Sequence, residues 1–250
     1  MACTSLIARL SSQYLSQVVQ ILINLEFFEK ACQELEKFLS SSSARGPVVL
    51  SATEQFRNET KTAEKQVFEL INSKIDDLVD TAEYDWAAVN TSPEPSNYIQ
   101  TLRRYLSTIM SSILLRLPRE IRELIYFDAL SHAANKILVR NPQPSLADSS
   151  TSAFPPKKTE TNVFKALPLS PEVQRINANG VAALAQDVQY LRDYVDGLEN
   201  GPMLKENLDE LQQTVDLMQS DNHEEFFDSS TRNKKYGRVD VMNGLILLEK

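Results

Sequence analysis

The amino-acid sequence predicts an all-α protein, and three observations support that prediction. Glycine is scarce, at 6 of 250 residues, and no Asn-Gly or Asp-Gly pair separates two runs of alternating polar and apolar residues. Long stretches are rich in Leu, Glu, Gln, Lys and Ala, which favour helices. Apolar residues recur at steps of three and four, which places them on one face of a helix.

The chain is organised around a predicted helical hairpin between Tyr98 and Arg140. Pro118 lacks a backbone N–H and disfavours helical geometry at Leu117, so we expect one helix to end there and the next to begin with Pro118 in its first position. Two antiparallel helices cover each other's apolar stripes only in part, so further helices must pack on either side. The stripes are Tyr98, Leu102, Tyr105, Leu106, Ile109, Ile113 and Leu117, and Ile121, Leu124, Ile125, Ala129, Ala133 and Ile137.

Two further helices are predicted before the hairpin. The first covers about 11–40 and carries apolar residues at helical spacing. The second covers about 51–81, because Ser51 and Glu54 have the spacing of a capping box. We expect Trp86, in the loop after this helix, to plug the end of the first bundle.

A change in composition divides the chain. Residues 141–171 contain six of the eleven prolines and eight serines or threonines, so we expect a linker or a disordered insertion there. The predicted domains are therefore an N-terminal helical bundle, 1–140, and a C-terminal helical bundle, 172–250.

Helical periodicity returns after this linker. Ser170 followed by Pro171 offers an N-cap and a first helical position, so a helix is predicted over 172–198. Another is expected over 203–219, and Asp221 offers the cap of a short helix up to residue 227. The chain starts close to a long helix and ends on apolar residues without a C-cap signal, so we expect it to be a piece of a longer helical rod.

Composition and charge exclude several classes of function. The net charge is −8, which does not suit a nucleic-acid-binding protein. Cys3 and Cys32 are the only cysteines and fit neither a disulfide framework nor a zinc site, so a reduced, cytoplasmic setting is expected. The sequence lacks a signal peptide and an apolar run of membrane-spanning length, so membrane contact should be peripheral.

No enzyme motif is present, and neither a cofactor nor a metal is predicted. The sequence contains no phosphate loop, no GxSxG elbow and no HExxH pair. Asp128 and His132 share a helical face at i, i+4, but further metal ligands are missing, so a hydrogen-bonded pair is the better interpretation. The acidic residues between Asp76 and Asp85 lack the glycine of a calcium loop and are interpreted as a solvated helix end.

A candidate partner-binding strip lies on the 172–198 helix. Asp187, Tyr190 and Tyr194 repeat at three and four beside the core positions, and aromatic residues are enriched at interfaces. The alternative is that the two tyrosines pack against a neighbouring helix with their hydroxyls at the rim. Both interpretations stay open at the level of sequence.

Two basic groups could meet an anionic lipid or an acidic partner, or could simply be solvated faces. They consist of Arg103, Arg104, Arg116, Arg119 and Arg122, and of Arg232, Lys234, Lys235 and Arg238. Glu120 and Glu123 are interspersed in the first group, which weakens the lipid interpretation for it.

The order of these features resembles a known family over nearly the whole chain. Residues 235–239, Lys-Tyr-Gly-Arg-Val, and 245–250, which end Leu-Leu-Glu-Lys, resemble the end of the Sec-fifteen subunit of the exocyst, also called exocyst component six. Weaker similarities are Tyr84-Asp85-Trp86, Leu117-Pro118, Asp187-Val188, Leu211-Gln212-Gln213 and Asp216-Leu217. The chain departs from the animal pattern at Val241 and Gly244, where relatives have Pro and Ala, and at Asp221 and His223, where they have two tryptophans.

The resemblance implies an elongated all-helical rod of two small bundles, in a complex that tethers secretory vesicles to the plasma membrane. It also implies binding to a GTP-bound Rab-type GTPase and to other exocyst subunits, and a cytoplasmic location with peripheral association with vesicles and the plasma membrane. It implies no catalysis. The alternative is a passive structural or adaptor rod that makes no GTPase contact.

Overall fold

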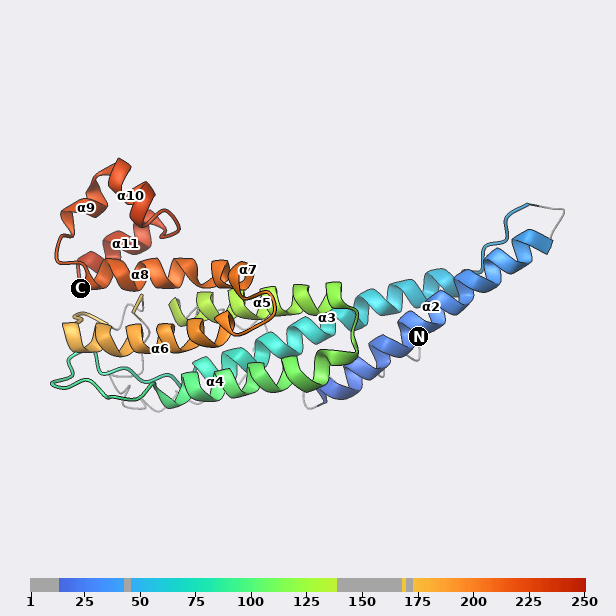
Figure 1. Cartoon of the computed structure of the whole chain (residues 1–250), viewed down its shortest axis with the longest axis horizontal. Coiled ribbons are helices and arrows are strands. Elements are labelled where there is room, and N and C mark those ends of the chain that lie inside the picture. Colours follow the sequence, from blue (N-terminus) through green and yellow to red (C-terminus); the bar gives the residue numbers. More distant parts are fainter. Residues whose placement is uncertain (1–13, 43–45, 139–167, 170–172) are drawn as a thin grey trace, which may run out of the picture. The chain divides into compact units, whose positions relative to one another are not determined.

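The structure is a computed structural model that describes residues 14–42, 46–138, 168–169 and 173–250 (Figure 1). Every regular element within these ranges is a helix, so the predicted all-α class is confirmed. Cys3, the Ser170-Pro171 cap and nearly all of the predicted linker lie outside the described residues. The predicted rod of two bundles stays a prediction.

Tertiary contacts divide the chain into two compact units. Unit 1 takes its residues from 1–74 and 105–129, and unit 2 takes its residues from 75–104 and 130–250. This division follows contacts and does not coincide with the predicted domains 1–140 and 172–250. The boundary between those domains was placed in the linker, nearly all of which lies outside the described residues. The two domains therefore stay a prediction.

Unit 1 contains a pair of long helices. Helix α2 covers Leu15–Ser42, and α3 begins at Ser51 and continues to Val79 in unit 2. The start of α3 is as predicted, but the carboxylate that holds it comes from α2. Glu36 accepts hydrogen bonds from the Leu50 N–H and from the Thr53 hydroxyl, each at 2.7 Å.

The break of the predicted hairpin is confirmed at Leu117-Pro118. Helix α4, Asn97–Thr108, continues as a π-helical turn, Ile109–Ile113, and a 3₁₀ turn, Leu114–Arg116. Leu117 is extended, and α5 covers Arg119–Leu138, so Pro118 precedes the helix by one position. The carbonyl of Pro118 accepts the first helical bond from the Arg122 N–H.

The core of unit 1 lies where α2 and α3 meet the residues around this break. Its fully buried side chains include Leu22, Val67, Leu106, Leu114 and Ile125. The Tyr126 hydroxyl of α5 donates to the Met110 carbonyl at 2.9 Å, which ties the two arms of the hairpin together. The predicted stripe residue Leu124 is 62% exposed, so the second stripe is narrower than expected.

In unit 2 the helix predicted over 172–198 begins later than its sequence signals suggested. Helix α6 covers Ala178–Asp196, and the side chain of Asn177 caps it by accepting from the Gly180 N–H at 2.9 Å. Residues 173–177 are not helical. The N–H groups of Ile176 and Asn177 donate to the carbonyls of Lys250 and Trp86.

The following helices of unit 2 are shorter than predicted. The 203–219 segment forms α7, Gly201–Lys205, a 3₁₀ turn, Glu206–Leu208, and α8, Asp209–Gln219. Short helices α9, Glu224–Phe227, and α10, Ser229–Lys235, follow.

The predicted cap at Asp221 is wrong, because α9 is preceded by His223, whose side chain makes no capping bond. The side chains of Asp228 and Asp240 do cap helices, by accepting from the Thr231 and Asn243 N–H groups. Asp240 starts α11, Val241–Leu248. Buried Phe226 packs with Leu217, Tyr236 and Val239 beneath this last helix.

Candidate partner-binding site

The predicted strip lies on α6, and the structure separates its acidic member from its two tyrosines. Asp187 is 1% exposed, so its carboxylate is part of the core of unit 2. Tyr190 and Tyr194 are half-buried. The accessible part of the strip therefore consists of the two tyrosines.

Asp187 holds the start of α4 and the loop before it. Its Oδ2 accepts from the Tyr84 hydroxyl at 2.5 Å, and its Oδ1 accepts from the Ser96 N–H at 2.7 Å. A carboxylate at the N-terminus of a helix also complements the helix dipole. Burial raises the pKa of Asp187 because it disfavours the charged form, and the bonds from Tyr84 and Ser96 oppose that rise.

Two buried tyrosines extend this network. The hydroxyls of Tyr84 and Tyr98 lie 2.6 Å apart. Because the single proton of Tyr84 goes to Asp187, Tyr98 must be the donor in this pair. Burial raises the pKa of both phenols, and the neighbouring Asp187 raises it further, so both remain neutral donors.

Amide side chains fasten the same loop to the start of α6. Asn177 and Asn179 both donate to the Ala88 carbonyl, at 2.9 and 3.0 Å. Gln186 donates to the Pro93 carbonyl at 2.7 Å. Hydrogen bonds thus hold the 83–96 loop along the first half of α6.

Trp86 packs within this loop and against the start of α6, and its predicted role at the end of the first bundle stays a prediction. Its side chain is 4% exposed and stacks on Tyr84, with the ring centroids 5.0 Å apart. A Cβ at Gly180 would lie 2.8 Å from the Trp86 Cα, so the loop can approach α6 this closely only because residue 180 is glycine.

Arg103 of α4 covers the two tyrosines of the strip. Its guanidinium carbon lies 4.6 Å from the ring centre of Tyr190 and 5.7 Å from that of Tyr194. These distances are those of cation–π contacts, which hold the rings in place. The sequence interpretation in which the tyrosines pack against a neighbouring helix therefore has structural support, while partner binding stays a prediction.

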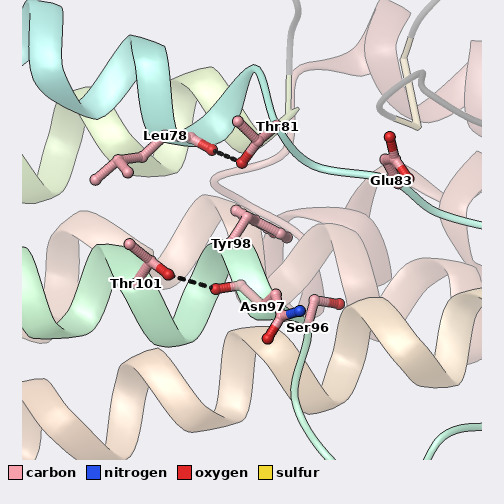
Figure 2. A pocket seen from close by; sticks show the side chains of 7 residues that line it. All are labelled: Leu78, Thr81, Glu83, Ser96, Asn97, Tyr98 and Thr101. Atoms are coloured by element: carbon pink, nitrogen blue, oxygen red, sulfur yellow. Dashed lines mark hydrogen bonds between the residues drawn. The ribbon is translucent and has the colours of Figure 1, made fainter.

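A pocket of about 560 Å³ opens beside the network, between the end of α3 and the start of α4 (Figure 2). The hydroxyls of Thr81 and Thr101 in its wall donate to the carbonyls of Leu78 and Asn97. Tyr98 connects the pocket to the buried network. The lining residues are Leu78, Thr81, Glu83, Ser96, Asn97, Tyr98 and Thr101.

Asp128 and His132 use different partners, so they do not act as a pair. Asp128 accepts from the Asn72 side chain at 2.8 Å. The His132 Nε2 lies 2.9 Å from Asp76 Oδ1, and Lys136 completes this ionic group. Among the described residues no group of three or more His, Cys, Asp or Glu side chains is arranged to hold a metal ion.

The two basic groups are dispersed among ordinary contacts. Arg103 lies over the tyrosines, and Arg119 pairs with Glu123 at 2.7 Å. In the second group Lys235 pairs with Glu225, and Arg232 donates to the Phe226 carbonyl. None of the helices in the described part of the chain is long and apolar enough to cross a membrane.

Sequence reasoning missed the roles of the residues that organise this site, namely Tyr84, Ser96, Tyr98 as a polar group, Arg103 and Gly180. One signal was available for Asp187. It follows Leu184 by three positions and precedes Leu191 by four, which places it on the core face of α6. The loop partners could not be found this way, because they are about 90 to 100 residues away in sequence.

Fold and site together define an all-helical protein whose described polar clusters hold helices and loops together. The chain belongs to the family described as exocyst complex subunit Sec15 C-terminal, whose sequence model matches residues 1–153 and 158–250. The resemblance noted in the sequence is thereby confirmed.

Curated relatives are similar over nearly the whole chain. The exocyst complex component sec15 of Schizosaccharomyces pombe is 26% identical, with 98% of this chain and 31% of the relative covered. The exocyst complex component SEC15 of Saccharomyces cerevisiae is 25% identical, with 97% and 28% covered. For exocyst complex component 6 of Caenorhabditis elegans the values are 25%, 94% and 27%. The chain thus spans less than a third of the length of these relatives, and no solved structure matches it.

Proposed function

We propose that this chain is the C-terminal part of an exocyst subunit that helps to tether secretory vesicles to the plasma membrane in exocytosis. The family match over nearly all residues carries this proposal. Its partners would include further exocyst subunits. Its location would be cytoplasmic, with peripheral association with vesicles and with sites of secretion. Protein contacts through helix faces would be its mode of action.

The finer part of the proposal is an effector role for a Rab-type GTPase in its GTP form. The surface offered for this contact is formed by Tyr190 and Tyr194 with Arg103. Tyrosine and arginine are the residue types most often found at interface hot spots, and rings that are already held in place lose little entropy on binding. Asp187 would contribute from beneath, because it fixes α4 and the adjoining loop against α6.

The alternative is a passive structural or adaptor role without a GTPase contact. One observation favours it: the two tyrosines are half-buried and already engaged by Arg103 within their own unit. In that case substitution of the two tyrosines would disturb only the packing of α4 on α6. The function of the chain would then be limited to binding other exocyst subunits.

A titration with a secretory Rab-type GTPase separates these proposals. The chain is titrated with the GTPase loaded with GDP or with a non-hydrolysable GTP analogue, and binding to the GTP form alone is expected. Tyr190→Ala combined with Tyr194→Ala should weaken that binding about tenfold. Phe227→Ala on α9, which also removes an exposed aromatic ring, is the matched control and should bind normally.

Circular dichroism shows whether each variant keeps its helices. Equal or absent binding of the two nucleotide states by a folded chain would exclude the effector role and favour the adaptor. Normal binding by the folded double variant would keep the effector role but move it to another surface.

A further inference from the structure

The pocket at the start of α4, with its volume of about 560 Å³, has the size of a site for a side chain or a small ligand. Its lining residues all belong to unit 2. In Figure 2 the Tyr98 side chain lies between Thr81, just after α3, and Asn97, at the start of α4. Thr81, Glu83, Asn97 and Thr101 are exposed, so a ligand can reach the pocket from solvent. We call this cavity the α3–α4 pocket.

Three hydroxyl groups of the wall have already donated their protons within the chain. Thr81 and Thr101 donate to backbone carbonyls three and four positions earlier, at 2.7 and 2.8 Å. The Tyr98 hydroxyl lies 2.6 Å from that of Tyr84 and is the donor of this pair. A hydroxyl whose proton is used can bind a further group only by accepting. The threonine oxygens of the wall therefore serve a ligand as acceptors.

The charge of the wall calls for the same kind of ligand. Among the described residues that line the α3–α4 pocket, Glu83 alone carries a charge at neutral pH. A carboxylate accepts hydrogen bonds and donates none. It has about four acceptor positions, so the interaction that Glu83 makes within the chain leaves room for a ligand. Asn97 adds an amide oxygen, which can accept as well.

An anion fits this pocket poorly, although a helix begins there. The N-terminus of a helix attracts negative charge, but that of α4 is already complemented by buried Asp187, which accepts from the Ser96 N–H at 2.7 Å. A second negative group would also be repelled by Glu83 in the wall. The pocket therefore favours a positive charge.

A cation on an apolar stem matches the remaining part of the lining. Leu78 and the ring of Tyr98 supply apolar surface beside the acceptors. Arginine combines an apolar stem with a planar head that has several N–H donors and no acceptor. Lysine has fewer donors on a more compact head. Because the acceptors of the wall are spread over several side chains, the arginine head can satisfy more of them.

We propose that the α3–α4 pocket binds an arginine side chain that projects from another protein. The wall oxygens would accept from the guanidinium N–H groups, Glu83 would pair with its charge, and the stem would lie against Leu78 and Tyr98. The pocket and the surface of Tyr190 and Tyr194 use different residues. This inference is therefore independent of the proposed GTPase contact.

The test titrates the isotope-labelled 250-residue chain with capped peptides and follows its backbone amide signals by NMR. The peptide Gly-Ser-Arg-Ser-Gly is compared with peptides that carry citrulline or lysine in place of arginine. The arginine peptide should move the signals of Thr81, Asn97 and Thr101. The citrulline peptide, which has nearly the same shape and no charge, should bind about tenfold more weakly. The lysine peptide should lie between them.

Two variants locate the arginine, and a third is the matched control. Glu83→Gln keeps the shape of the side chain but removes its charge, and it should weaken binding about tenfold. Thr101→Val removes one acceptor and should weaken binding about threefold. Asp221→Asn removes an exposed negative charge elsewhere in unit 2 and should bind normally. All three side chains are exposed, so the fold should survive, and circular dichroism checks this.

Four outcomes would overturn the proposal. Unmoved signals of the pocket residues would remove the site, and equal binding of the arginine and citrulline peptides would show that charge is not recognised. Equal weakening by Asp221→Asn and Glu83→Gln would reduce the binding to general attraction by an acidic chain. Tighter binding of spermidine than of the arginine peptide would assign the pocket to a free polyamine.

Discussion

At the scale of single residues, Asp187 is the most informative side chain of the described structure. It is a carboxylate in the core, and it accepts hydrogen bonds from a phenol, that of Tyr84, and from a backbone amide, that of Ser96. A buried acid held in this way keeps segments together and leaves few lone pairs for outside ligands. Its position therefore argues for a supporting role beneath the Tyr190 and Tyr194 surface.

Removal of the Asp187 carboxylate should destabilise the chain. In Asp187→Ala the Tyr84 hydroxyl and the Ser96 N–H lose their acceptor inside the core, which costs about 2–3 kcal/mol of unfolding free energy. Urea denaturation measures this change. Asp193→Ala, an exposed aspartate on the same helix, is the control and should change stability by less than about 0.5 kcal/mol. Equal stability of the two variants would show that the network contributes little.

The same residue predicts a dependence of stability on pH. Because burial raises the native pKa of Asp187, the folded state binds its proton more readily than the unfolded state does. Protonated Asp187 thus contributes to the free energy of unfolding. This contribution is present in full below the unfolded pKa, about 3.9, and is lost as the pH rises through the higher native pKa. Asp187→Asn cannot ionise and should lack this loss.

The measurement for this prediction is the difference in unfolding free energy between the parent chain and Asp187→Asn at several pH values. That difference should fall with rising pH across the window, whereas the difference between the parent and Asp193→Asn should stay nearly constant. A difference that rises with pH for Asp187→Asn would mean that the native pKa is lowered.

At the scale of elements, close approaches decide how the short helices of unit 2 pack. Gly244 faces Phe226, and an added Cβ would collide with the phenyl ring. Phe226 is 1% exposed and enclosed by Leu217, Tyr236 and Val239, so its ring has little room to move. This close approach gives a physical reason for glycine at a position where animal relatives have alanine.

Gly244→Ala should therefore destabilise the chain, although alanine favours helices. Overpacking of a filled core costs about 1–3 kcal/mol, which exceeds the gain of up to about 1 kcal/mol in helix propensity. Thermal unfolding followed by circular dichroism measures the balance. Met242→Ala on the same helix, where the side chain is 64% exposed, serves as the control. An increase in stability for Gly244→Ala would show that the Phe226 ring yields easily.

At the scale of the whole molecule, charge argues against attraction to an acidic membrane. The net charge is −8, and several members of the two basic groups are engaged, as in the pairs Arg119 with Glu123 and Lys235 with Glu225. A membrane-surface role would need several cations aligned toward the lipid, each contributing about 1 kcal/mol. The peripheral membrane association proposed above should therefore depend on protein partners.

This expectation can be checked by sedimentation with vesicles. Vesicles rich in phosphatidylserine should leave the chain in the supernatant at low salt, as neutral vesicles do. Cosedimentation with the acidic vesicles alone, lost at high salt, would restore the lipid-binding interpretation of the basic groups. Lys234→Glu combined with Arg238→Glu would then show whether the second group is responsible.

The sequence by itself determined the local structure of this protein. Helical spacing and the scarcity of glycine predicted the all-α class, Pro118 predicted the break in the central hairpin, and Ser51 marked the start of α3. These features depend on neighbours within a few residues, whose spacing can be read directly. The terminal residues were likewise enough to indicate the family.

Only the tertiary structure decided which polar residues meet. It placed Asp187 in the core with Tyr84 and Ser96, set Trp86 against Gly180, and delayed the start of α6 to Ala178. It also showed that Phe27 and Phe38 point away from the core of unit 1. Periodicity identifies a face of a helix, but the segments that cover that face come from distant parts of the chain, and packing alone selects them.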